Sequence, residues 1–141
     1  MRDAVYLDTS GWLAALSPRE QGHKKAHQAY QALVQDAARL VTTNLVVAEM
    51  HILLTRRHDP ATGLAFLESL YRDPAHEVRF VTRVLEAGAV RQWIRPYADK
   101  PLSLADATGF EVMRTEGIDR VLAYDRHFRD AGFEVIPEEG A

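Results

Sequence analysis

The sequence predicts an α/β fold in which a mostly parallel sheet is covered by helices on both faces. Two observations support this prediction. Short apolar runs alternate along the chain with longer segments whose apolar residues recur at helical spacing, and the connections between them are short. The first run, from Ala4 to Leu7, is apolar at consecutive positions, which is typical of a strand buried on both faces of a parallel sheet.

The first half of the chain has two predicted strands and three predicted helices. In chain order, we expect a strand at 4–8, helices at 10–16 and 19–38, a strand at 39–43 and a helix at 44–58. The first helix ends at Ser17 and Pro18, because proline cannot continue a helix. Small and apolar residues recur at helical spacing in the second helix. The third is apolar on most sides as far as Arg56, which predicts a buried helix.

The second half has three predicted strands and four predicted helices. We expect a helix at 59–73, a strand at 76–81, helices at 82–96 and 101–117, a strand at 118–125, a helix at 126–132 and a strand at 133–137. Pro60 suits the first turn of its helix, where an amide hydrogen has no helical partner. Ser103 and Gly117 fit the N-cap and the C-terminal stop of another helix. No repeat or linker interrupts the pattern, so we expect a single domain over 1–141, with 137–141 as a frayed tail.

The composition excludes several classes of protein. The chain has 141 residues, 47% of them hydrophobic, which suits one soluble core and argues against disorder. No apolar stretch approaches the roughly 20 residues that cross a bilayer, and the start lacks the apolar region of a secretory signal. The absence of cysteine excludes disulfides and thiolate zinc sites and fits a reducing cytosol, so we expect a cytoplasmic protein. A net charge of −3 is unlike that of proteins which coat nucleic acid non-specifically.

Four carboxylates are predicted to meet at one edge of the sheet. Asp8 and Asp125 each end an apolar strand. Asp106 lies in the first turn of the helix at 101–117, and Glu49 lies in the helix after the second strand. In parallel sheets the ends of the strands and the starts of the following helices share the edge where ligands bind. Glu49 is the most informative, because its helical neighbours are apolar and a buried carboxylate is costly unless it is paired, hydrogen-bonded or metal-bound.

Each carboxylate also has a purely structural interpretation. Asp8 and Asp125 can be the N-caps of the helices that follow them. Asp106 stands three residues after Ser103, which is a capping-box pattern. Glu49 can form a buried salt bridge with an arginine. These interpretations treat the four residues separately and do not explain why all four are expected at the same edge.

The joint acidic pattern predicts a divalent-cation site. Neighbouring carboxylates cannot all remain ionised without a cation, because like charges raise one another's pKa. Mg²⁺ or Mn²⁺ relieves this repulsion, since these hard cations take oxygen ligands, and a metal held in this way promotes phosphodiester hydrolysis. Competing chemistries fit less well: LDTS lacks the second acid of haloacid-dehalogenase-type phosphatases, and no glycine-rich phosphate loop is present. His23 and His27 share a helical face, but no third zinc ligand is evident.

Four segments of the sequence resemble the PIN domain family, and within it the VapC-type toxin ribonucleases of type II toxin–antitoxin pairs. They are YLDTSGWLAAL, TTNLVVAEMHILL, LSLADATGFEVM and RVLAYDRHF, in this order. The resemblance covers nearly the whole chain and implies a three-layer α/β/α PIN-like fold with a central, mostly parallel sheet. It also implies a Mg²⁺-dependent endoribonuclease, with Mn²⁺ as a substitute, that forms a homodimer and is inhibited by a small antitoxin.

The resemblance also assigns roles to individual residues. By position, the acidic catalytic set is Asp8, Glu49, Asp106 and Asp125. Within this set, Asp8 and Asp106 are expected to be the direct metal ligands. Ser10 matches a hydroxyl that assists beside the first acid, and Asn44 matches a polar position at the head of the glutamate helix. Two other functions stay open: a PIN-fold module that binds RNA with little catalytic activity, and an RNA-processing nuclease without a toxin role.

Basic and aromatic residues are candidates for further RNA contacts. The candidates for holding flanking phosphates are Arg56, Arg57 and Arg126. The candidates for stacking on bases are Trp12, Trp93 and Tyr97. A solvated helix face is the simpler interpretation of each arginine, and a place in the core is the simpler interpretation of each aromatic residue. The RNA target and its cleavage sequence do not follow from these patterns.

Overall fold

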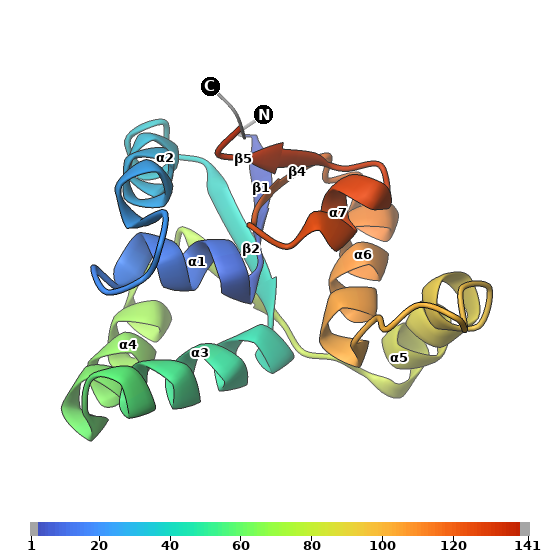
Figure 1. Cartoon of the computed structure of the whole chain (residues 1–141), viewed down its shortest axis with the longest axis horizontal. Helices are drawn as coiled ribbons and strands as arrows, with labels where there is room; N and C mark the ends of the chain where they lie inside the picture. Colours follow the sequence, from blue (N-terminus) through green and yellow to red (C-terminus); the bar gives the residue numbers. More distant parts are fainter. Residues whose placement is uncertain (1–2, 139–141) are drawn as a thin grey trace.

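Five parallel strands form the central sheet of the computed structural model, which describes residues 3–138 (Figure 1). In chain order the strands are β1 (Ala4–Leu7), β2 (Arg39–Thr43), β3 (His76–Arg79), β4 (Arg120–Leu122) and β5 (Glu134–Ile136). Across the sheet they lie in the order β3-β2-β1-β4-β5, and every neighbouring pair is parallel. The direction of winding therefore reverses between β1 and β4, which is where ligands bind in sheets of this kind.

Helices cover both faces of the sheet, which confirms the predicted three-layer α/β/α architecture (Figure 1). One face carries α1 (Thr9–Leu16), α2 (His23–Gln35), α3 (Asn44–Arg57) and α4 (Pro60–Arg72). The other face carries α5 (Arg83–Ala89), a π-helical turn (Val90–Ile94), α6 (Leu104–Glu116) and α7 (Arg126–Asp130). Within residues 3–138, none of the helices is both long enough and apolar enough to span a membrane.

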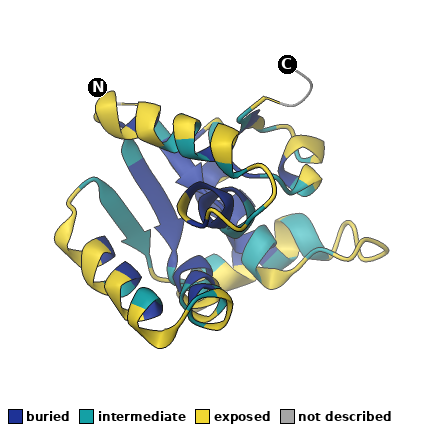
Figure 2. Cartoon of the chain, turned by 60° about the vertical axis from the view of Figure 1, so that its left-hand side comes forward, coloured by how far each residue is buried: buried dark blue, intermediate teal, exposed yellow. Residues whose placement is uncertain are grey.

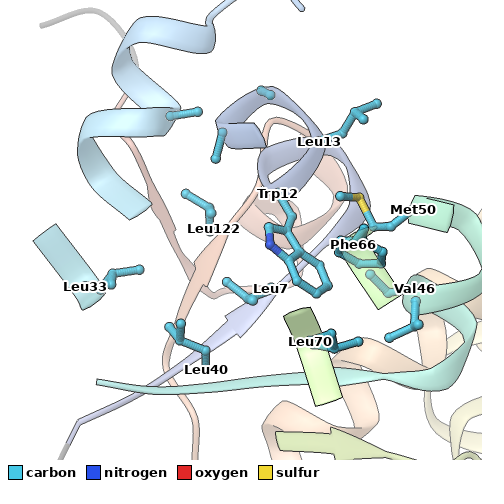
Figure 3. Close-up of a cluster of buried hydrophobic side chains, with 14 of the residues drawn as sticks. Leu7, Trp12, Leu13, Leu33, Leu40, Val46, Met50, Phe66, Leu70 and Leu122 are labelled. Carbon is cyan, nitrogen blue, oxygen red and sulfur yellow. The ribbon is translucent and has the colours of Figure 1, made fainter. Parts of the chain in front are cut away.

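Each face of the sheet has its own hydrophobic core. Successive residues of a strand point to opposite faces, so Val5 and Leu7 pack in one core and Tyr6 packs in the other. Trp12 lies in the middle of the first core, where it is 1% exposed and its ring meets that of Phe66 edge to face, with 5.0 Å between centroids (Figure 3). The central strands are buried, and the exposed residues of the helices lie on their outer sides (Figure 2).

Three expectations from the sequence are wrong. Helix α2 begins at His23, because the chain makes turns over 18–22 that end with Gly22 in a left-handed conformation (φ 80°). Helix α3 is buried on one side only, because the sheet and α4 leave its other side open, and its Ile52 is 38% exposed. Tyr97 is not a core residue, since it lies in the segment after the π-helical turn and is 45% exposed.

Side-chain caps fix where three of the helices begin. Asp8, Thr43 and Ser103 each accept a hydrogen bond from a backbone amide in the first turn of α1, α3 and α6, respectively. Ser103 Oγ accepts from the amide of Asp106 at 3.0 Å, and Gly117 ends α6 with a φ of 69°, so both predicted signals are confirmed. Because α1 and α3 follow directly on β1 and β2, their first turns lie at the carboxyl-terminal edge of the sheet.

Gly11 allows α1 to approach the end of β4. A Cβ atom at this position would lie 2.5 Å from the carbonyl oxygen of Leu122 and 2.5 Å from the backbone nitrogen of Ala123, which is closer than any side chain tolerates. Next to this contact, the amide of Asp8 donates to the carbonyl oxygen of Leu122 at 3.1 Å. The ends of β1 and β4, and the residues that follow them, are therefore held side by side.

Candidate active site

One cleft at the carboxyl-terminal edge of the sheet is lined by all four predicted carboxylates. The cleft has a volume of about 800 Å³. Its lining includes Asp8 after β1, Ser10 in α1, Glu49 in α3, Asp106 in α6 and Asp125 after β4. The topology explains why residues so far apart in the sequence meet, because the strand order reverses between β1 and β4.

Asp8 combines the capping of a helix with a place in the cleft. Its carboxylate accepts hydrogen bonds from the backbone amide of Ser10 at 3.2 Å and from the Ser10 hydroxyl at 2.6 Å. Only 5% of the residue is exposed. The structural interpretation made from the sequence is therefore correct, but it does not exclude a chemical role, since the same side chain lines the cleft.

Asp106, Asp125 and His127 form a group with the spacing of metal ligands, and residues 3–138 contain no other such group of three. One ligand atom from each lies within 4.8 Å of the other two. The Nδ1 atom of His127 is 3.1 Å from Asp125 Oδ1 and 3.5 Å from Asp106 Oδ2. Asp125 also caps α7, because its Oδ1 atom accepts from the backbone amide of His127 at 2.9 Å. Asp8 lies outside this group but lines the same cleft as its two aspartates.

Ser10 connects the two strand ends that carry Asp8 and Asp125. Its hydroxyl donates to Asp8 and accepts from the backbone amides of Tyr124 at 2.9 Å and Asp125 at 3.1 Å. One side chain thus links the end of β1 to the segment that follows β4. This geometry gives Ser10 a positioning role in the cleft, which requires no direct contact with a substrate.

Burial and like charge raise the pKa values of the cleft carboxyls. Burial is the main cause that raises the pKa of Asp8 to about 7, and the hydrogen bond from Ser10 opposes this rise. The negative charges of Asp106 and Asp125 raise the pKa of Asp8 further. Burial also raises the pKa of Asp106 to about 6, and the charge of Asp125 adds to this effect. Full ionisation of the cleft therefore costs free energy that a bound cation would offset.

Glu49 lies on the open side of the cleft rather than on a buried apolar face. The prediction from its helical neighbours is wrong, because α3 buries its opposite side and leaves Glu49 exposed. The alternative of a buried salt bridge fails for the same reason. The pKa of Glu49 is nevertheless raised, first by partial burial of the carboxyl and then by the charge of Asp8. Glu49 thus adds a fourth negative charge to the cleft from a different helix.

Other residues that the sequence singled out have more varied positions. Asn44 lies outside the cleft lining, and its side-chain oxygen accepts from a backbone amide after β3 at 2.7 Å, which gives it a structural role. Arg57 lines the cleft and forms an ion pair with Glu20, which lines it too. Arg56 and Arg126 are exposed and lie outside this lining. Among the predicted phosphate contacts, Arg57 is therefore the one that the fold places at the cleft.

The histidine pair on α2 has a structural partner. The Nδ1 atoms of His23 and His27 lie 2.7 Å and 3.1 Å from the carbonyl oxygens of Ala14 and Ala15, respectively. These hydrogen bonds satisfy carbonyl groups in the last turn of α1, which have no partner inside the helix. The pair therefore joins α2 to α1.

Sequence reasoning missed three residues near the acids. His127 stands two residues after Asp125 in the segment DRHF, and this spacing at the start of a helix is a signal that could have identified it. Lys25 reaches the cleft from α2, and no local motif marks it because its position depends on how α2 packs. Glu138 lines the cleft from the tail predicted to be frayed, of which 139–141 lie outside the described residues.

The donor set fits a hard divalent cation. Carboxylate oxygens predominate, and such ligands favour Mg²⁺ or Mn²⁺ over zinc, which prefers nitrogen and sulfur. The pKa values of Asp8 and Asp106 are raised, so their ionised forms are disfavoured, and a nearby positive charge would stabilise these ionised forms. The cleft thus has the composition and the electrostatics of a divalent-cation site.

The fold and the acidic cleft are those of a PIN domain. The family model of the PIN domain matches residues 5–134, and the chain belongs to this family. The relatives that it matches include the 23S rRNA-specific endonuclease VapC20 from two strains of Mycobacterium tuberculosis. These are 33% identical to it over 137 residues, which covers 95% of this chain and 99% of the relative.

Solved structures agree with the family assignment. The crystal structure of Mycobacterium tuberculosis VapC20, described as a sarcin–ricin loop cleaving toxin, matches with a TM-score of 0.78 and 31% sequence identity over 92% of this chain and 95% of that chain. FitAcB from Neisseria gonorrhoeae matches with a TM-score of 0.63 over 93% of this chain and 95% of that chain. At 16% identity, this second likeness shows the fold alone.

Proposed function

We propose that this protein is a Mg²⁺-dependent endoribonuclease that hydrolyses RNA phosphodiester bonds as the toxin of a toxin–antitoxin pair. The observation that carries the proposal is the convergence of four carboxylates, from two helices and two strand ends, on one cleft. The similarity to VapC20, a 23S rRNA-specific endonuclease and a sarcin–ricin loop cleaving toxin, supports the choice of RNA as the substrate.

The proposed roles of the residues follow from their positions. Asp8 and Asp106 would hold the metal, with Asp125 and His127 beside them. A bound Mg²⁺ or Mn²⁺ would neutralise charge on the scissile phosphate and lower the pKa of water. Glu49 and Asp125 would orient the attacking water, and one of them would accept its proton. The P–O3′ bond would then break, and the departing ribose 3′-oxygen would take up a proton from this carboxyl or from solvent.

The proposed partners are an antitoxin and a second copy of the chain. A toxin that cleaves RNA harms its own cell unless it is inhibited, and the likeness to VapC20, described as a cleaving toxin, supports a small antitoxin bound at the acidic cleft. The homodimer and the antitoxin both rest on membership of the family and on the likeness to VapC20.

Metal-dependent cleavage of RNA tests the proposed function. We expect the purified protein to cut a synthetic hairpin with the sequence of the 23S rRNA sarcin–ricin loop in the presence of Mg²⁺ or Mn²⁺. We expect EDTA to lower the rate at least about 100-fold, because the carboxylates alone cannot neutralise the phosphate. The assay follows the labelled RNA on denaturing gels and identifies the new 5′ and 3′ ends.

The control for this assay is a parallel preparation of the Asp8→Asn variant, which reveals any contaminating nuclease. RNA binding without cleavage by the wild-type protein at any metal concentration would contradict the proposal and indicate an RNA-binding module instead. Equal cleavage in EDTA would contradict the role of the metal.

A further inference from the structure

A second, smaller cavity of about 130 Å³ lies beside the acidic cluster, that is, the group formed by Asp106, Asp125 and His127. It is formed by residues of the segment that follows α5 and of α6 and α7. These helices lie on the same side of the sheet (Figure 1). Its lining is Trp93, Tyr97, Lys100, Leu102, Phe110, His127, Asp130 and Ala131. Aromatic and aliphatic side chains form most of the wall, with charged groups among the lining residues.

The tryptophan wall of this cavity is held rigidly. The indole nitrogen of Trp93 donates to Glu111 Oε1 at 3.1 Å, and its ring meets Phe110 edge to face with 5.1 Å between centroids. Glu111 is buried and is fixed in turn by two hydrogen bonds from Arg114, at 2.9 Å and 2.7 Å. A ring fixed in this way offers a prepared surface for a planar ligand, so little side-chain freedom is lost on binding.

Tyr97 gives the cavity a more open aromatic wall. Its ring is exposed, although the neighbouring Trp93 and Phe110 are half-buried and buried, respectively. The amino group of Lys100 lies 5.4 Å from the centroid of the Tyr97 ring, within the range of a cation–π contact. The lysine lies over one face of the ring, so a flat ligand would stack on the other face, and the positive charge favours a ligand that carries a phosphate.

His127 belongs both to this cavity and to the acidic cluster. Its Nδ1 atom lies 3.1 Å from Asp125 and 3.5 Å from Asp106, while the residue also lines the cavity. The cavity is therefore one side chain away from the carboxylates. A group bound there would therefore lie next to the cluster of Asp106, Asp125 and His127.

We propose that the cavity binds a nucleobase of the RNA substrate, namely a base next to the scissile phosphate, with Tyr97 as its stacking partner. This inference rests on the proposed function. Unpaired RNA bases are recognised by stacking on aromatic side chains and by hydrogen bonds to their edges. The cavity offers both, because Lys100 can donate to a base edge and Asp130 can accept from one. Its volume is below the 300–1,000 Å³ or so of pockets for whole drug-sized ligands, which suits one base of a longer chain.

The test combines changes in the enzyme and in the RNA. Each nucleotide around the cleavage site of a short RNA is replaced in turn by an abasic ribose, and kcat/KM is measured with wild type and with Tyr97→Ala. We expect one abasic position to lower wild-type kcat/KM by about 5- to 100-fold, the range for loss of one stacked base. Tyr97→Ala should show a similar loss on intact RNA and little further loss at that position, because both changes remove the same contact.

Two further variants serve as controls. Tyr97→Phe keeps the ring and should retain the sensitivity to that abasic position. Tyr71→Ala removes another exposed tyrosine, on α4 and outside the cavity, and should leave cleavage unchanged. The inference would be overturned if Tyr97→Ala cleaved intact RNA with the kcat/KM of wild type. It would also be overturned if the loss from Tyr97→Ala and the loss from an abasic nucleotide multiplied at every position.

Binding measurements separate this inference from the proposed function. The affinity of Asp8→Asn for the intact and abasic RNAs is measured by fluorescence anisotropy, which requires no cleavage. The base-binding cavity is supported if Asp8→Asn binds one abasic RNA more weakly than intact RNA, and if the double variant with Tyr97→Ala binds both RNAs equally. Equal affinities for all the RNAs overturn it, whereas absence of wild-type cleavage overturns the proposed nuclease.

Discussion

Replacing Asp8 with asparagine is expected to lower RNA cleavage by about 10²- to 10³-fold and to leave the fold intact. The substitution removes a negative charge from the most buried of the four acids. The fold should survive because the asparagine oxygen can still accept the hydrogen bonds that Ser10 donates at 3.2 Å and 2.6 Å. Initial rates in Mg²⁺ measure the first effect, and circular dichroism measures the second.

A matched control for this variant is Asp119→Asn. Asp119 is exposed and precedes β4, so it lies at the opposite edge of the sheet from the cleft. The same chemical change there should leave the rate unaltered. Undiminished cleavage by Asp8→Asn, from a preparation free of other nucleases, would show that Asp8 is only a helix cap.

The metal-free protein is expected to lose stability relative to Asp8→Asn as the pH rises from about 5 to 8. A carboxyl whose pKa is raised in the folded state binds its proton more tightly there than in the unfolded chain. Its contribution to stability is therefore present at low pH and is lost as the pH rises toward the folded-state pKa, which is about 7 for Asp8 and about 6 for Asp106. With about 1.4 kcal/mol for each pKa unit, we expect a relative loss of roughly 2–4 kcal/mol.

Other titrating groups affect stability in different ways. Hydrogen bonds from Arg39 lower the pKa of Glu77 to about 2. Glu77 therefore changes the folding stability only at pH values below the range from about 5 to 8. Burial lowers the pKa of His76. The contribution of His76 to folding stability therefore changes with pH in the opposite direction to that of Asp8, because it is lost as the pH falls. Both groups are present in wild type and variant alike. Subtracting the two unfolding free energies therefore isolates the effect of the cleft.

Urea unfolding of both proteins across this pH range, in EDTA, measures the difference. Added Mg²⁺ should raise the wild-type melting temperature more at pH 8 than at pH 5, because protons compete with the metal for the same oxygens. It should have little effect on Asp8→Asn. Parallel curves for the two proteins at every pH would contradict the raised pKa of Asp8.

Most of the fold could be predicted because its elements carry local signals. The consecutive apolar residues of β1, the cap at Ser103 and the glycine stop at Gly117 each specify structure within a few residues. The start of α2 at His23 could not be predicted in this way. The preceding turns depend on a left-handed Gly22 and on how α2 packs against α1, which are not encoded by helical spacing.

The candidate site could be predicted in part for the same reason. Asp8, Asp106 and Asp125 stand at strand ends or at the start of a helix, so the parallel topology alone brings them to one edge. The place of Glu49 in the helix after β2 predicts its position at this edge, whereas its exposure could not be predicted, because that depends on what covers α3. The contact of the His127 ring with Asp106, which is 21 residues away, could not be predicted, because it depends on how α6 and α7 pack together.

Calorimetric titration with Mn²⁺ tests most directly whether these carboxylates form one cation site. We expect wild type to bind the ion, Asp106→Asn to bind it at least about tenfold more weakly, and Asp119→Asn to bind it like wild type. An asparagine at 106 leaves the backbone amide that Ser103 caps in place, so α6 should still begin where it does. Equal binding by wild type and Asp106→Asn, or no binding by wild type, would contradict a shared metal site.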